Sequence, residues 1–168
     1  MKSRTALIGL GNILMRDDGI GVHTVQEIEG RFRFTPKIDI VDGGTLGLAL
    51  LPLIGGYTRV LFVDAVEAGL EPGAIVVREG EQVPAFLGSS VSMHQAGLAD
   101  LMYAARLAGV MPPMVGLVGI QPQSVDLGLE TTALLQDKRE DLIRAVLSRI
   151  EAWGIEIIGP QGVSQIHS

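Results

Sequence analysis

A glycine-rich segment that directly follows an apolar run constrains the fold of this chain more than any other feature. Residues 5–10 read Thr-Ala-Leu-Ile-Gly-Leu, which is typical of a short buried strand. Residues 9–21 then combine several glycines with two adjacent carboxylates, Asp17 and Asp18. Glycine lets the backbone turn sharply and approach a neighbouring element closely. Because open α/β sheets keep their binding sites at the carboxyl ends of strands, the segment predicts a site near Asp18.

The same segment begins like a dinucleotide-binding loop, because Gly9 and Gly11 follow the predicted strand. The third glycine of that pattern would fall on Leu14, and two carboxylates stand where a pyrophosphate needs a helix N-terminus without negative charge. No Walker A lysine pattern occurs in the sequence. The residues therefore disfavour a nucleotide cofactor, although a nucleotide-dependent α/β enzyme stays an alternative.

The composition suits a single compact domain, which we expect to span residues 1–158, with a loose polar tail at residues 159–168. Hydrophobic residues make up 47% of the 168 residues, and charged residues make up 19%. A net charge of -6 disfavours nucleic acid as a partner, because phosphate binding needs a basic patch. The lack of cysteine excludes disulfides and thiolate metal sites and fits the reducing cytoplasm. No apolar run approaches the roughly 20 residues that span a bilayer.

Apolar runs alternate with amphipathic segments along the chain, which is typical of an α/β fold. We expect further strands at residues 38–41, 59–64, 73–78 and 115–120, and helices at residues 19–33, at residues 47–53, after residue 94 and from Thr131 or Thr132. The turn before residues 73–78 is too short for a helical crossover, so this strand is predicted to be antiparallel and at an edge. Residues 79–91 are predicted to form an irregular loop, and Asp17 or Asp18 to cap the first helix.

Three polar side chains from separate loops are expected to meet at one edge of the sheet. Asp64 ends an apolar run typical of a central parallel strand, which places it near Asp18. His94 lies on a loop before a helix and is a better candidate than His23 or His167, although an exposed polar cap is the alternative. Carboxylates and an imidazole together can hold a divalent transition ion and leave positions open to a substrate.

Five segments, in the same order and spread over most of the chain, match one known family. They are residues 9–21, Asp42-Gly-Gly-Thr, Val63-Asp-Ala-Val-Glu-Ala-Gly, Met93-His-Gln-x-Gly-Leu and Gly119-Ile-Gln-Pro-x-x-Val-Asp-x-Gly. In these segments the sequence resembles the hydrogenase maturation endopeptidases, which trim the C-terminal extension from the large subunit of nickel-iron hydrogenase. Two positions depart from many relatives, which have Glu where this chain has Asp18 and where it has Gln95. Neither change removes a type of ligand atom from the predicted site.

The resemblance implies a three-layer α/β/α sandwich around a five-stranded, mostly parallel mixed sheet with one antiparallel strand. It places the catalytic and metal-binding side chains on Asp18, Asp64 and His94. Asp42 is an additional candidate, for which a turn residue before two glycines is the alternative role. The resemblance also implies an aspartyl-type protease whose nickel is supplied by the substrate precursor, and we expect it to work as a cytoplasmic monomer.

The mechanism that the resemblance implies uses no serine, cysteine or threonine nucleophile, and the sequence places none in a recognised elbow. No His-Glu-x-x-His motif occurs, which excludes a zincin metalloprotease. Nickel in the precursor would position the scissile bond and polarise its carbonyl group or a water molecule. The alternative of a different class is a nickel-sensing docking or chaperone protein that binds the precursor without cutting it.

Overall fold

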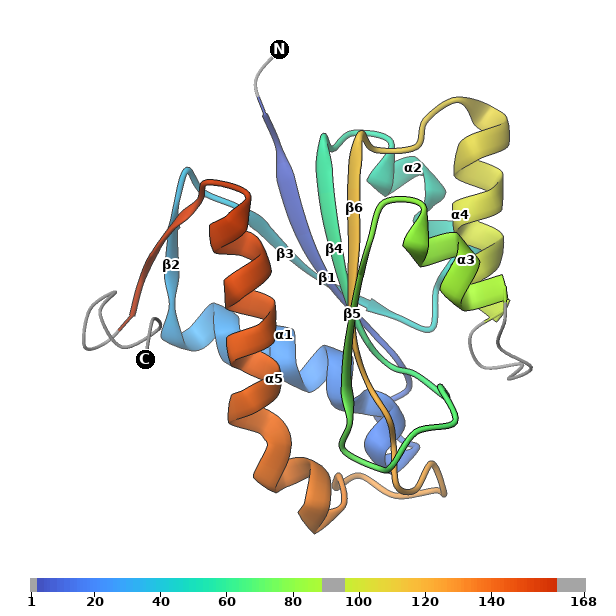
Figure 1. Ribbon diagram of the computed structural model, residues 1–168, viewed down its shortest axis with the longest axis vertical. Coiled ribbons are helices and arrows are strands. Elements are labelled where there is room, and N and C mark those ends of the chain that lie inside the picture. The colour runs from blue at the N-terminus through green and yellow to red at the C-terminus, as the bar shows by residue number, and fades with distance from the viewer. Residues whose placement is uncertain (1–2, 89–95, 160–168) are drawn as a thin grey trace.

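A five-stranded sheet runs through the centre of the computed structural model, which describes residues 3–88 and 96–159 (Figure 1). In chain order its elements are β1 (Thr5–Leu10), the 3-10 turn η1 (Arg16–Gly19), α1 (Ile20–Arg31), β2 (Arg33–Thr35), β3 (Asp39–Gly44), η2 (Gly47–Leu50), α2 (Leu51–Ile54), β4 (Arg59–Ala65), β5 (Ile75–Glu79), α3 (Gln82–Gly88), α4 (Ala96–Ala108), β6 (Met114–Ile120), α5 (Ala133–Ala152) and β7 (Glu156–Ile158). Apart from Gly159, the expected tail lies outside the described residues.

The strand order in the central sheet is β3-β1-β4-β6-β5. Only β5 is antiparallel to its neighbour, and it lies at an edge, which confirms the predicted mixed sheet. In the parallel part, Gly9 pairs with both Asp42 and Val63, and Asp64 pairs with Gly119. The carboxyl ends of β1, β3, β4 and β6 therefore meet along one edge of the sheet, the edge at which these parallel strands end.

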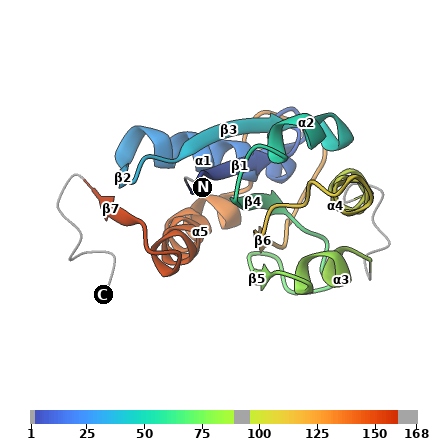
Figure 2. The ribbon, with the colours of Figure 1, turned by 90° about the horizontal axis from the view of Figure 1, so that it is seen from above.

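Helices cover both faces of the sheet, with α1 and α5 on one side and α2, α3 and α4 on the other (Figure 2). Successive strand residues point to opposite faces. Leu7 and Leu61 accordingly pack in a cluster with α1 and α5, whereas Ile8 and Phe62 pack in a second cluster with the other three helices. The continuous apolar runs of β1 and β4 are buried on both faces, as parallel strands between helical layers require. The predicted three-layer α/β/α architecture is confirmed.

The predicted loop at residues 79–91 is wrong over much of its length, because α3 forms there. Pro84 suggested a loop, but it occupies the third position of α3, where a helix has no internal partner for a backbone N–H group. Val83 and Leu87, four residues apart, are buried against the rest of the core. Tertiary burial of this apolar pair thus outweighs the glycine and proline signals.

A second, two-stranded sheet of β2 and β7 was not predicted. Each strand is only three residues long, too short for a pattern of period two to be distinguished from chance. The first helix consequently ends at Arg31, and residue 33 of the predicted helix begins β2. No helix in the described ranges combines the length and apolar character needed to cross a membrane.

Candidate active site

The glycines of residues 9–21 allow η1 to lie directly against the central strands. Gly11 has a φ of +122°, and a Cβ atom there would overlap the carbonyl oxygen of Asp18. A Cβ atom on Gly21 would overlap the carbonyl oxygens of Leu10 and Val63. Only glycine tolerates both the backbone conformation and such close approach. The glycines therefore fix the turn that carries Asp18 to the carboxyl edge of the sheet.

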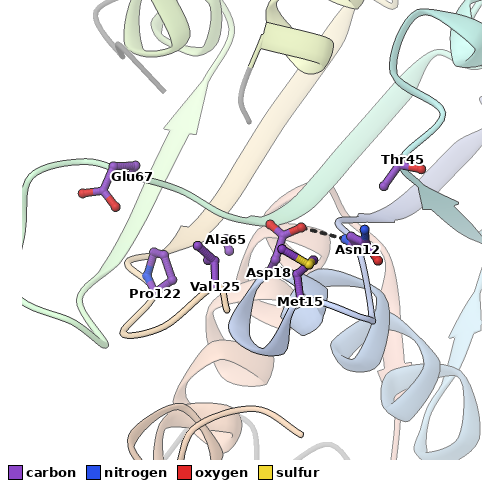
Figure 3. Close-up of a pocket in the computed structure, with 8 residues that line it drawn as sticks. All are labelled: Asn12, Met15, Asp18, Thr45, Ala65, Glu67, Pro122 and Val125. Carbon is purple, nitrogen blue, oxygen red and sulfur yellow. Dashed lines mark hydrogen bonds between the residues drawn. The ribbon is translucent and has the colours of Figure 1, made fainter. Parts of the chain in front are cut away.

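Asp18 and Asp64 both lie at this edge and are nearly inaccessible to solvent, with exposed fractions of 2% and 4%. Asp18 is in η1, which packs against β4, and Asp64 is the penultimate residue of β4. One carboxylate oxygen of Asp18 accepts a 2.8 Å hydrogen bond from the backbone N–H of Asn12 (Figure 3). The two carboxylates thus come from separate elements to one end of the sheet.

Two cavities that share Thr45 open at this edge. The first, of about 320 Å³, is lined by Asn12, Met15, Asp18, Thr45, Ala65, Glu67, Pro122 and Val125 (Figure 3). The second, of about 270 Å³, is lined by Leu10, Gly11, Gly44, Thr45, Asp64, Gly47, Gly97 and Leu98. Asp18 therefore borders one cavity, and Asp64 borders the other. A ligand that fills both cavities would pass along both carboxylates.

Asp17 has a structural role that the sequence did not reveal. Its carboxylate is fully buried and accepts hydrogen bonds from the backbone N–H groups of Gln123, Ser124 and Thr132 and from the Thr132 hydroxyl, at 2.7–3.0 Å. The predicted cap on α1 is wrong, because the N-cap is Gly19, and α1 has no capping hydrogen bond from a side chain. Asp17 binds the segment after β6 because that segment folds back across η1.

The segment of residues 121–132 forms one wall of the Asp18 cavity and is fastened to η1. The backbone N–H of Arg16 donates to the carbonyl of Gly128 at 2.9 Å, and the N–H of Gly128 donates to the carbonyl of Leu14 at 2.8 Å. Pro122 and Val125 contribute the wall itself. Sequence reasoning gave these residues no role, although the Gly119-Ile-Gln-Pro-x-x-Val segment belongs to the family resemblance.

Gln121 supports the part of the cavity rim that carries Glu67. Its side chain is buried, and its carboxamide oxygen accepts hydrogen bonds from the backbone N–H groups of Ala68 at 2.8 Å and Leu70 at 3.3 Å. These bonds hold the loop after β4, on which Glu67 lines the cavity. Sequence reasoning assigned Gln121 only to the end of a strand, because a buried carboxamide gives no periodic signal.

Asp42 lies on β3 and lines neither cavity. Its exposed carboxylate accepts a 3.0 Å hydrogen bond from the backbone N–H of Gly44, which is the bond of an Asx turn. The geometry therefore favours the turn role of Asp42.

His23 lines a separate cavity of about 410 Å³ together with Glu130 and Arg139. Burial lowers the pKa of His23, and the charge of Arg139 lowers this pKa further, while Asp42 opposes the shift. His23 therefore lies apart from the cavities that border Asp18 and Asp64.

His94 lies outside the described residues, so the predicted set of Asp18, Asp64 and His94 stays a prediction. Within residues 3–88 and 96–159, no three side chains of His, Asp or Glu are grouped so that they could hold a metal ion. The carboxylates of Asp18 and Asp64 nevertheless supply oxygen donors at the rims of two adjoining cavities. Such oxygens can bind a divalent cation or accept a proton from an attacking water.

Comparisons with known proteins agree with this geometry. A family model described as hydrogenase maturation protease matches residues 22–149. The chain is 32% identical over 161 residues to the hydrogenase 2 maturation protease of Escherichia coli K12, which covers 95% of this chain and 98% of that protein. It is 36% identical over 149 residues to the hydrogenase expression/formation protein HoxM of Cupriavidus necator, which covers 88% of this chain and 74% of that protein.

Solved structures show the same relationship. The hydrogenase maturating endopeptidase HybD from Escherichia coli superposes with a TM-score of 0.87 at 33% sequence identity, over 94% of this chain and 98% of that chain. A solution structure of an endopeptidase from the same species gives a TM-score of 0.88 over the same shares. Sequence, family model and fold therefore agree that this chain belongs to the hydrogenase maturation protease family and is an endopeptidase.

Proposed function

We propose that this chain removes the C-terminal extension from the large-subunit precursor of a nickel-iron hydrogenase after nickel has been inserted. The family supports the proteolytic reaction and the class of substrate. The observation that carries the location of the chemistry is the burial of Asp18 and Asp64 beside two cavities at one edge of the sheet. In this proposal the scissile bond lies along that edge.

Asp18, Asp64 and His94 engage the nickel that the precursor brings. Gly97, three residues after His94 in the sequence, lines the cavity of Asp64, which supports a role for the histidine at the same edge. Two carboxylates and an imidazole leave coordination positions open, so nickel can stay bound to the precursor while it contacts the protease. The ion thereby positions the scissile bond and polarises its carbonyl group or an attacking water molecule.

The electrostatics of the site favour a cationic ligand. A carboxylate that is largely removed from water is stabilised when a ligand brings positive charge close to it. Nickel in the precursor would supply this charge only when the substrate is ready to be cut. A precursor without nickel would bring no such charge and would bind less well. The proposed site thus makes the protease selective for the nickel-loaded form of its precursor.

We further infer that the protease works as a monomer in the cytoplasm. The proposed set of Asp18, Asp64 and His94 lies within one chain, so the proposed site needs no residue from a second copy. The chain has no cysteine, which fits a reducing compartment. Sedimentation of the purified protein would test the first inference, because a stable dimer would contradict it.

The proposed function can be tested by incubating the pure protein with nickel-loaded and nickel-free precursor and measuring the mass of the large subunit. We expect the extension to be lost from the nickel-loaded precursor alone. An Asp64→Asn variant serves as the control, because it keeps the shape of the site and removes one charge. A nickel-loaded precursor that forms a complex with the protein but keeps its extension would contradict proteolysis and favour a docking protein.

A further inference from the structure

The cavity beside Asp18 has walls that are mostly apolar. Met15, Ala65, Pro122 and Val125 provide them, and they lie around the carboxylate of Asp18 (Figure 3). The cavity volume of about 320 Å³ is at the lower end of the range of roughly 300–1,000 Å³ that is usual for ligand pockets. This volume suits one or two amino-acid side chains, and the apolar walls suit side chains without charge.

The apolar walls are fixed in place before any substrate arrives. Asp17 accepts hydrogen bonds from Gln123 and Ser124, which lie between Pro122 and Val125, and from Thr132. These bonds hold the segment that forms the wall. Met15 forms a β-bridge with Gly128 of the same segment. A cavity whose walls are preorganised selects ligands by shape, because little ordering free energy has to be spent on binding.

Several apolar side chains on the two segments beside the cavity are exposed. They come from the two segments that pair at Met15 and Gly128, and they are Ile13, Leu14, Val125, Leu127 and Leu129. Leu127 and Leu129 are 82% and 70% exposed, which leaves large apolar surfaces in water. Of these side chains, Val125 lines the cavity that contains a predicted catalytic carboxylate, and Leu129 lines the separate cavity of His23.

We propose that the cavity beside Asp18 is a specificity subsite that binds an apolar side chain of the precursor, on a residue that flanks the scissile bond. The proposal rests on the proposed function, in which Asp18 acts at that bond. Because Asp18 is part of the lining, a peptide bond held at its carboxylate brings a neighbouring side chain to the cavity.

Charge sharpens this selectivity. Asp18 and Glu67 both line the cavity, so an acidic side chain of the substrate would meet two negative charges. Apolar walls also leave a buried acid without compensating hydrogen bonds, which is costly. Shape and charge therefore exclude acidic residues from the flanking position, and a neutral aliphatic residue satisfies both.

The experiment compares Val125→Asp with Val110→Asp. Both valines are partly exposed, at 46% and 37%, but Val110 lies before β6, at the opposite end of the sheet. We expect Val125→Asp to lower kcat/KM for the natural nickel-loaded precursor on the order of 10- to 100-fold, mainly through KM. Val110→Asp should leave kcat/KM unchanged. A precursor with Lys at the flanking position should regain most of the loss with Val125→Asp, because the new carboxylate attracts it.

A second measurement needs no protein variant. The unchanged protein is given precursors that carry Leu, Ser, Lys or Asp at either residue flanking the cut. Leu should be preferred to Asp by about 10-fold or more at one of the two positions. Equal rates for all four residues at both positions would overturn the subsite, as would a Val125→Asp protein with unchanged preferences. If the unchanged protein cuts no nickel-loaded precursor at all, the proposed function fails instead, so the two failures differ.

Discussion

Several carboxylates differ in burial between the two ends of the parallel strands. At the carboxyl end, Asp17, Asp18 and Asp64 are 0–4% exposed, although Asp42 and Glu67 at the same end are exposed. At the amino end, the ion pair of Arg4 and Asp39 spans 3.4 Å, and its side chains are 57% and 47% exposed. An exposed ion pair contributes little to stability, whereas a buried carboxylate is costly unless its surroundings compensate for the lost water. The burial of these carboxylates at the carboxyl end therefore indicates a role other than solubility.

The buried acids themselves fall into two groups. Asp17 accepts four hydrogen bonds and holds the segment after β6 against η1. Asp18 and Asp64 instead line cavities that a ligand can enter. These two neighbours in the sequence therefore have different surroundings. Asp17 stabilises the wall of the Asp18 cavity, and Asp18 borders that cavity and is the residue for which we propose a role in the chemistry.

The largest effect should come from removing a charge at the carboxyl end. We expect Asp64→Asn to slow processing of nickel-loaded precursor on the order of 1,000-fold, because the charge that meets the substrate's nickel is lost. The melting temperature should stay the same or rise, since a buried charge is removed. Mass spectrometry of the large subunit and thermal unfolding measure the two quantities. Processing at the unmodified rate would show that the two ends of the sheet do not differ in function.

A methyl group on Gly11 should separate η1 from the strands. Gly11→Ala would need a φ of +122° and would overlap the carbonyl oxygen of Asp18, so we expect a loss of about 4 kcal/mol in the free energy of unfolding. Gly30→Ala is the matched control, because nothing lies within 4 Å of a Cβ atom there and the residue is within α1. The control should gain about 0.5–1 kcal/mol, and both values follow from urea unfolding.

Replacing Asp17 should weaken both the fold and the cavity wall. Asp17→Ala leaves three backbone N–H groups, one buried and two partly buried, without their acceptor, and we expect a loss of about 3 kcal/mol in the free energy of unfolding. Processing should fall as well, because Val125 loses its support. A loss of only about 1 kcal/mol with normal processing would instead match a simple helix cap and contradict the structural role of Asp17.

The smallest effect is expected at the amino end. Arg4→Ala removes the ion pair with Asp39 and a cation-π contact with the ring of Tyr57, whose centroid lies 4.7 Å away. The Arg4 side chain is 57% exposed and so is largely in contact with water, and the free energy of unfolding should therefore fall by less than about 1 kcal/mol. Processing should be unchanged. Differential scanning calorimetry at low and high salt would measure the change, and a loss of several kcal/mol would remove the contrast between the two ends.

Much of the fold could be predicted because its signals are local and periodic. The apolar runs of β1 and β4 identified central strands, and the short turn before β5 identified the antiparallel edge. The helix α3 could not be predicted because Pro84 suggested a loop, although burial of apolar side chains stabilises the helix. The sheet of β2 and β7 could not be predicted because each strand is too short to show a pattern. Elements that depend on tertiary contacts leave little trace in the sequence.

The site was only partly accessible to sequence reasoning, for a related reason. Asp18 and Asp64 follow strands, so the topology alone brings them to one edge. The wall at Pro122 and Val125 depends on hydrogen bonds between Asp17 and residues more than 100 positions away. No pattern along the chain predicts such a partner, and capping was the simpler interpretation of Asp17. Side-chain hydrogen bonds at long range are therefore what the structure adds.

The central claim is that carboxylates at the carboxyl end of the sheet perform the chemistry, whereas those at the amino end do not. The most direct test measures the rate at which Asp18→Asn and Asp39→Asn proteins remove the extension from nickel-loaded precursor, with unfolding free energies measured in parallel. Our account predicts that Asp18→Asn loses at least about 100-fold in rate and remains folded, and that Asp39→Asn keeps its rate within about 2-fold. Equal rates for the two folded variants would contradict it.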